Sequence, residues 1–499
     1  MTSERRHVSE LHAGSIGVVA AIAASAAFIA PAVSVTAGNV FLAGFTGTAS
    51  PLAYIVGTLV CIALAIVIVD FAKKLPSAGS FYTYLTRAFG ARAGFVTGVL
   101  LFGAYVILLP FQAAFFGTFT SGVAASAGLH LPWQFWAIAL MAISTTCALV
   151  GARPSLRIGL AGVTFELALF TILSVVIVIK GGHTGNSVQP FEFSHSFHGV
   201  QGILLATVYT IFGFVGFESA TTLGEEAKNP RRTIPRAVLG TCVVIGVFYV
   251  LSSYAEVIGF GISPSGLHEL QNNLTPFTSL SHAYIGGWYA TLINIATISS
   301  FIALNIATVT CGSRMIFAMG RDGVLPRAFA KVNRHRSPSV AAIAVGLWGV
   351  LAGLIVGGIW GAESSASWFS YLATLLLVGA YAMLAVGVVR FYRRDYRSEF
   401  SWFRHGFVPL LALGGIGCVL YGNIHPLPPA PLRYFIYVAI AIAVGAYLVA
   451  AYLDRRNPQL MREAGQLFAA VEDAEPSLAV AQPGQVPLAS PSDPLGSPK

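Results

Sequence analysis

The sequence predicts an all-α integral membrane protein with twelve transmembrane helices. Of its 499 residues, 56% are hydrophobic and only 10% are Asp, Glu, Lys or Arg, whereas soluble domains average about 25% charged residues. A spanning helix needs about 20 mainly apolar residues, and twelve such stretches follow one another along the chain. Basic residues are concentrated in every second loop between these stretches, which is the pattern of multispan proteins.

The chain is read as one membrane domain with two cytoplasmic ends. The first apolar stretch is not expected to be a cleavable signal peptide, because it exceeds 7–15 apolar residues and further spans follow it. Residues 1–16 form the expected N-terminus, 17–453 the twelve-span domain, and 454–499 a largely disordered tail rich in Pro, Ser, Ala and acidic residues. The spans are expected at 17–43, 53–72, 94–126, 133–151, 155–180, 201–223, 237–260, 281–318, 339–359, 365–391, 407–423 and 433–453.

The net charge of +9 can indicate a nucleic-acid partner, but its distribution indicates membrane topology instead. With the N-terminus inside, all of the 29 Lys and Arg residues except Lys180 and Arg433 fall in inside segments. The positive-inside rule therefore predicts a plasma-membrane protein with both termini cytoplasmic. It also places the loops 73–92, 224–236 and 319–338 in the cytoplasm. No nucleic-acid partner is expected.

Neither a cofactor nor a metal site is expected. The five cysteines all lie in apolar spans without paired spacing, which is typical of small buried side chains. The sequence has no Walker loop, dinucleotide fingerprint, metal motif or Ser-His-Asp cue. A multispan membrane enzyme would need clusters of such residues at the membrane face, so an enzyme is the least favoured class.

The first and sixth spans are interrupted. The segment "TVYTIFGFVGFESATTLGEEAKNPRRTIPRAV" (207–238) begins as an apolar span and is broken by Gly213 and Gly216. The first span is broken by Pro31 within "IAPAVSVTAGN" (29–39). Unpaired backbone groups in hydrocarbon are costly unless they line a cavity. Paired interruptions in equivalent spans are typical of the binding site of a secondary transporter.

These interruptions provide the expected substrate site. The N–H groups that begin a half-helix favour a carboxylate, and unpaired carbonyls can accept from an ammonium group. The aromatic rings beside Gly213 could cover a substrate and offer a π-face to its ammonium. The alternatives are a plain proline kink at Pro31, close helix packing at the two glycines, and core-facing or lipid-facing rings. The expected substrate-binding residues are Ala30, Pro31, Ala32, Val33, Ser34, Phe212, Gly213, Phe214, Val215, Gly216 and Phe217.

Three glutamates lie at membrane depth, where charged residues are rare and usually functional. Glu166 lies in the middle of the fifth span, where loss of hydration favours the neutral carboxyl; it could carry a proton or make a structural hydrogen bond between helices. Glu218, just past the sixth-span break, could couple conformational changes through a hydrogen-bond network or cap the helix. Glu256, near the outer end of the seventh span, is expected to contact water.

Four segments resemble the amino acid–polyamine–organocation (APC) family of permeases. They are the sixth span with its following loop (212–238), "KKLPSAGSFYTYLTRAFG" (73–90), "SRMIFAMGRDGVLPRAFAKVN" (313–333) and the broken first span. With the span count, the resemblance covers about residues 15–453. The chain departs from the family at the first break, which is Gly-rich in many members but reads Pro31-Ala32-Val33-Ser34 here.

The resemblance implies a LeuT-type 5+5 inverted repeat with discontinuous helices 1 and 6. The repeats would be about 17–180 and 201–391, with accessory spans in 407–453. In the family an aromatic residue at the position of Phe212 is a gate candidate. Span five can carry a charged residue near the place where sodium binds in related transporters, which Glu166 approximately matches.

The implied function is secondary active transport of amino acids or related amines by alternating access. Proton symport is favoured, exchange and facilitated diffusion are alternatives, and a transporter-like membrane sensor is a further alternative. A neutral zwitterionic amino acid fits better than a dication, because the central region has few acids. The expected partners are this substrate, protons and the lipid bilayer, and no oligomeric state is predicted.

Overall fold

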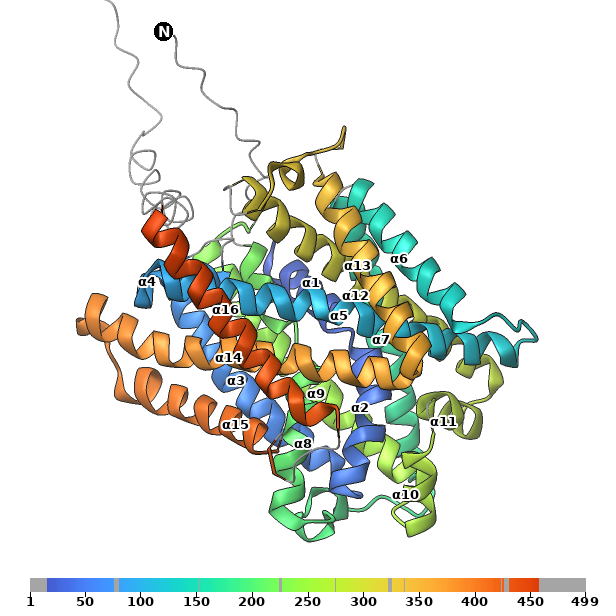
Figure 1. Ribbon diagram of the computed structural model, residues 1–499. Helices are drawn as coiled ribbons and strands as arrows, with labels where there is room; N and C mark the ends of the chain where they lie inside the picture. The colour runs from blue at the N-terminus through green and yellow to red at the C-terminus, as the bar shows by residue number, and fades with distance from the viewer. Residues whose placement is uncertain are drawn as a thin grey trace, which may run out of the picture.

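In the computed structural model the chain forms a bundle of long helices (Figure 1). The structure describes residues 16–75, 80–150, 152–223, 227–273, 275–321, 325–335, 337–422, 424–425 and 430–456. The expected N-terminus 1–16 and tail 454–499 therefore lie outside the described residues, except for Ile16 and for residues 454–456, which continue the last helix. The α-helices are α1 (Val18–Ile29), α2 (Pro31–Thr46), α3 (Ser50–Lys74), α4 (Ser80–Phe89), α5 (Ala91–Ser126), α6 (Trp133–Val150), α7 (Ala152–Lys180), α8 (Gly199–Gly213), α9 (Pro230–Phe260), α10 (Pro264–Gln271), α11 (Pro276–Tyr284), α12 (Gly287–Arg321), α13 (Ser339–Trp360), α14 (Ala362–Asp395), α15 (Val408–Gly422) and α16 (Phe435–Arg456).

Eleven helical segments of the described part are long and apolar enough to cross a membrane. The chain is therefore a multi-pass membrane protein. The first expected span consists of two shorter helices, α1 with 12 residues and α2 with 16. The number twelve depends on counting α1 and α2 as one interrupted span, and it stays a prediction.

Two spans differ most from the sequence prediction. The expected span 281–318 is divided, because α11 ends at Tyr284 and α12 begins at Gly287. Between them Gly286 has a φ of +139°, a conformation that glycine adopts without a steric cost and that no α-helix contains. The seventh span begins at Pro230 instead of residue 237, because proline is well suited to the first helical position.

The longest helices form the centre of the bundle. α5 packs against α14, α3 against α9, and α7 against α12. Large aromatic side chains fill the spaces between them, including Phe71, Phe170, Tyr249, Phe301 and Tyr381, all fully buried. Burying such rings provides much of the packing energy between helices. This frame supports the two interrupted spans on several sides.

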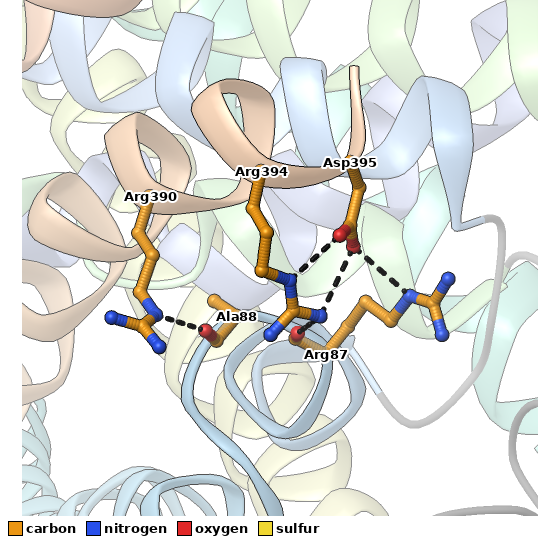
Figure 2. A network of polar contacts seen from close by, with 5 residues as sticks. All are labelled: Arg87, Ala88, Arg390, Arg394 and Asp395. Carbon is orange, nitrogen blue, oxygen red and sulfur yellow. Dashed lines mark hydrogen bonds and ion pairs between the residues drawn. The ribbon is translucent and has the colours of Figure 1, made fainter. Parts of the chain in front are cut away.

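The short helix α4 is fastened to the end of α14 by arginines (Figure 2). Arg390 Nε donates to the carbonyl of Ala88 at 2.9 Å, and Arg394 Nη2 donates to the carbonyl of Arg87 at 3.3 Å. The last carbonyls of a helix have no partner within it and carry partial negative charge. Asp395 completes the junction with ion pairs to Arg394 at 2.7 Å and to Arg87 at 3.3 Å.

The connector between the sixth and seventh spans contacts the start of the first. Ile16, just before α1, pairs with Ala227 in an isolated parallel bridge. The amide of Lys228 donates to the carbonyl of Ile16 at 3.0 Å. The connector that follows one interrupted span is thus hydrogen-bonded to the residue just before the other.

Candidate functional site

The first span is interrupted at a single residue. α1 ends at Ile29, and Ala30 has a left-handed backbone with φ +53° and ψ +68°. It is the only non-glycine residue of the described chain with a positive φ, a conformation that costs roughly 1–2 kcal/mol. Pro31 begins α2 and has no N–H to donate. Such strain is concentrated at functional sites and is held there by the surrounding structure.

The two halves of this span expose backbone groups at the interruption. Ala32 and Val33 are in the first turn of α2, where N–H groups have no acceptor within the helix. The hydroxyl of Ser34 turns back and donates to the carbonyl of Ile29 at 3.1 Å. The backbone N–H groups that are expected to donate to the substrate therefore lie in the first turn of α2.

The sixth span is interrupted over Phe214–Gly216. α8 ends at Gly213, a turn follows, and a 3₁₀ helix, η3 (Phe217–Leu223), continues the chain. Tight bonds of the i→i+3 kind close the turn, from the Phe214 amide to the Ile211 carbonyl and from the Val215 amide to the Phe212 carbonyl, both at 3.0 Å. Gly216 has a φ of +111°, which favours glycine.

The two interruptions are in contact. A Cβ atom added to Gly216 would collide with the ring of Phe28 at the end of α1. One added to Gly213 would lie 3.8 Å from the Cβ of Ser34. The hydroxyl of Ser219 bonds to the hydroxyl of Ser25 at 3.3 Å. The structure thus brings the two interruptions together, and the assignment of these residues to a substrate site stays a prediction.

Glu218 is buried directly beside the second interruption and accepts three hydrogen bonds. Tyr105 of α5 donates to Oε1 at 2.7 Å, and Tyr381 of α14 donates to Oε2 at 2.9 Å. The amide of Gly216 also donates to Oε2 at 3.1 Å. The carboxylate thus caps the interrupted backbone and also connects it to two neighbouring spans. These are the contacts that the two alternatives for Glu218, helix capping and coupling through a hydrogen-bond network, would each use.

Tyr249 of α9 holds the other side of the interruption. Its hydroxyl donates to the carbonyl of Gly213 at 2.6 Å, so this carbonyl already has a partner in this conformation. The Tyr249 ring lies 5.1 Å from the ring of Phe214 and 5.1 Å from that of Tyr54. The end of α8 is therefore positioned by side-chain contacts from the seventh span.

The three phenylalanines of the sixth-span break differ in their surroundings. Phe212 is half-buried, and its ring meets Phe111 of α5 edge to face at 5.8 Å. The rings of Phe214 and Phe217 are fully buried, the latter 5.9 Å from Tyr381. Phe212 is the least buried of the three rings, whereas Phe214 and Phe217 belong to the core.

Glu166 lies on α7 and is 1% exposed. Ser300 of α12 faces its carboxyl group, but neither carboxyl oxygen has a hydrogen bond of ordinary geometry with a described residue. Both roles expected for Glu166, proton carrier and partner in a hydrogen bond between helices, therefore stay predictions. The Glu166 carboxyl group is close enough to act electrostatically on Tyr249. Glu166 therefore lies near the interrupted spans.

The expectation for Glu256 is wrong. The sequence predicted that this residue contacts water, but it is fully buried. The reason is that α9 does not end at an open surface, since α2 and the short helix α10 both pack against it. Asn39 of α2 donates its side-chain amide to Glu256 Oε2.

The comparison with known proteins identifies the class of molecule. A family model for amino acid permeases matches residues 26–425. The chain belongs to the amino acid permease family. Its members are transporters and not enzymes, and the expected APC resemblance is confirmed.

The permease has relatives in several bacteria. A branched-chain amino acid permease of Lactococcus lactis is 25% identical over 442 residues, which cover 83% of this chain and 89% of that protein. A methylthioribose transporter of Bacillus subtilis is 25% identical over 432 residues, with the same coverage of 83% and 89%. A γ-aminobutyric acid permease of Escherichia coli is 26% identical over 311 residues, covering 60% of this chain and 64% of that protein.

Sequence reasoning missed several residues that hydrogen-bond the sixth-span break and the buried glutamates of the permease. Tyr105, Tyr249 and Tyr381 direct their hydroxyls at the sixth-span segment, and Asn39 directs its amide at Glu256. A signal was available, because a tyrosine or asparagine in the middle of an apolar span needs a hydrogen-bond partner when it is buried. The identity of each partner depends on helix packing and has no local signature.

Proposed function

We propose that this permease is a secondary active transporter that moves neutral amino acids across the plasma membrane by alternating access, driven by protons. The observation that carries the proposal is the contact between two interrupted spans. Both interruptions are buried inside the bundle, where irregular backbone is tolerated only if it is covered by protein or lines a cavity. Such paired breaks are where secondary transporters bind their substrates.

The chemistry of the breaks fits an amino acid. The first-turn amides of Ala32 and Val33, at the positive end of α2, suit the carboxylate. Backbone carbonyls at the breaks can accept hydrogen bonds from its ammonium group. In this conformation the Gly213 carbonyl accepts from Tyr249 and the Gly216 amide donates to Glu218. A substrate carboxylate that binds the Gly216 amide would displace Glu218, whereas an ammonium group could share the Gly213 carbonyl with Tyr249, since a carbonyl oxygen has two lone pairs. Binding would in this way alter how the break is held by α5, α14 and α9.

The substrate class follows from the acids at the site. Glu218 is occupied by two phenol hydroxyls and one amide, and Glu166 lies on a separate helix. A dicationic substrate would need a further carboxylate for its second ammonium group, so a neutral zwitterion fits better. The names of the branched-chain amino acid and γ-aminobutyric acid relatives support an amino acid as well.

Proton coupling is assigned to Glu166. A carboxyl group that is buried without hydrogen bonds is unstable as an anion, and it can become one when a conformational change admits water. The proposal includes a LeuT-type arrangement of two five-span repeats with α1/α2 counted as one span. The alternatives are exchange and facilitated diffusion without proton coupling.

The test begins with thermal-shift screening of the purified protein against the twenty amino acids and common polyamines. The amino acid that stabilises it most is then followed as a labelled substrate in proteoliposomes, with and without an inward proton gradient. Accumulation above the external concentration only with the gradient supports symport. Uptake that needs internal amino acid indicates exchange, and equilibration regardless of the gradient indicates facilitated diffusion. Stabilisation by no amino acid, together with no uptake, contradicts the proposed function.

A further inference from the structure

Glu256 and Asn39 form a second buried polar cluster, away from the two breaks. Glu256 lies in the last turns of α9, at the end opposite to its basic first turn, and Asn39 lies on α2. Both side chains are 0% exposed. Glu256 makes no ion pair with a described residue, and no cation is among the groups that act on its carboxyl. The titratable group that faces it from a neighbouring element is the phenol of Tyr54 on α3.

The hydrogen bonding of this pair is incomplete. The Asn39 amide nitrogen contacts Glu256 Oε2, while Glu256 Oε1 and Asn39 Oδ1 have no partner among the described residues. An unpaired carboxylate without a cation is very costly in such surroundings. A proton on Glu256 removes the charge. The nitrogen and oxygen of an asparagine amide are interchangeable in position, so a turned Asn39 amide would accept the O–H of the neutral carboxyl.

The cluster is connected to both interrupted spans. Asn39 is on α2, the half-helix that follows the break at Ala30. The hydroxyl of Tyr54 lies against the neighbouring Gly38, where an added Cβ would be 2.6 Å away. The Tyr54 ring lies 5.1 Å from the ring of Tyr249, at a tilt of 44°, and the Tyr249 hydroxyl holds the Gly213 carbonyl. Tyr249 and Glu256 are seven residues apart on α9 and so lie on one face of that helix.

We propose that Glu256 and Asn39 form a proton-binding site that fastens the outer half of the first span to the seventh span. Its ligand is a proton. This inference rests on the proposed transport function, because the separation of α2 from α9 is taken to be a step of the transport cycle. When α2 moves away from α9, water reaches the carboxyl and the proton can leave. When α2 closes, the carboxyl must be neutral again, so closure requires proton uptake from the same side.

Infrared spectroscopy of the purified full-length protein tests whether the Glu256 carboxyl group carries a proton. At neutral pH without substrate, the wild type is expected to show a carboxylic-acid C=O band that is absent from Glu256→Gln. In Asn39→Ala the acid remains but loses its partner, so the band should shift instead of vanishing. Glu269→Gln, which replaces an exposed acid on the adjacent helix α10, is the matched control and should keep the wild-type band.

The melting temperature gives a second readout. A proton that only the folded state holds stabilises it at low pH, and this stabilisation is lost as the pH rises. The fall in melting temperature from mildly acidic to mildly alkaline pH should be smaller in Glu256→Gln than in the wild type and in Glu269→Gln. Identical carboxylic-acid bands, or identical pH dependence, in the wild type and Glu256→Gln would overturn the proposal. Neither readout needs substrate, so a failure here is distinguishable from a failure to transport amino acids.

Discussion

Glu218 couples three parts of the bundle through a single carboxylate. Its three donors come from α5, from α14 and from the break itself. A buried carboxylate is stable only when its oxygens are hydrogen-bonded, so loss of any donor is energetically costly. A change in the position of the Gly216 amide therefore affects Tyr105 and Tyr381 as well. We therefore propose Glu218 as the residue through which substrate binding alters helix packing.

Removing one of these donors should weaken the fold at this point. Tyr105→Phe leaves Glu218 Oε1 without its phenol donor, and we expect the free energy of unfolding to fall by about 1–3 kcal/mol. Unfolding by sodium dodecyl sulfate in mixed micelles measures it. Tyr437→Phe, on a residue of α16 that is 66% exposed, is the control and should be neutral. Equal stabilities of the two variants would show that the hydrogen bond does not hold the break.

Glu166 should carry the dependence of transport on the proton gradient. Glu166→Gln mimics the neutral carboxyl and cannot release a proton. We expect it to keep substrate binding and exchange of internal for external substrate, but to lose accumulation driven by a pH gradient. Uptake and counterflow in proteoliposomes separate these activities. Accumulation with unchanged pH dependence in this variant would assign the coupling to another residue.

At the scale of the element, the interruptions were predictable and their surroundings were not. Pro31, Gly213 and Gly216 act locally, through a missing N–H or a missing Cβ, so the sequence alone predicts breaks at these positions. The burial of Glu256 depends on α2 and α10 packing over the end of α9, which no local pattern reveals. The division of the expected span 281–318 depends on the single backbone conformation of Gly286.

The junction between α4 and α14 gives an element-scale prediction. Arg390→Gln removes the guanidinium that donates to the α4 carbonyl of Ala88, and the free energy of unfolding should fall by about 1 kcal/mol. Arg393→Gln is the matched control, because Arg393 stacks over Phe400 and Trp402 instead. Unfolding in mixed micelles compares them. A larger loss in the control than in Arg390→Gln would contradict the role given to this junction.

At the scale of the whole molecule, the arrangement of basic residues predicts the orientation in the membrane. The end of α16, like the junction of α4 and α14, lies on the opposite side of the bundle from α10 (Figure 1). Basic residues accumulate on the former side, at the ends of α4, α14 and α16. The positive-inside rule predicts that this side is cytoplasmic.

Cysteine labelling tests this orientation. Ser398 follows α14 and Ser194 lies in the loop after α7, and both are exposed. In intact cells a membrane-impermeant thiol reagent should label Ser194→Cys, and it should label Ser398→Cys only after the membrane is permeabilised. Labelling of Ser398→Cys from outside would reverse the topology.

The central claim is that the two touching breaks bind the substrate, and equilibrium binding to purified variants tests it most directly. Gly216→Leu would drive a branched side chain into Phe28 at a backbone with positive φ, whereas Gly213→Ala meets its nearest neighbour at an ordinary 3.6 Å. For the amino acid found by thermal-shift screening, we predict that Gly213→Ala binds like the wild type. Gly216→Leu, still inserted and monodisperse, should bind at least about tenfold more weakly, a loss of about 1.4 kcal/mol or more. Wild-type affinity in Gly216→Leu would show that the substrate binds elsewhere.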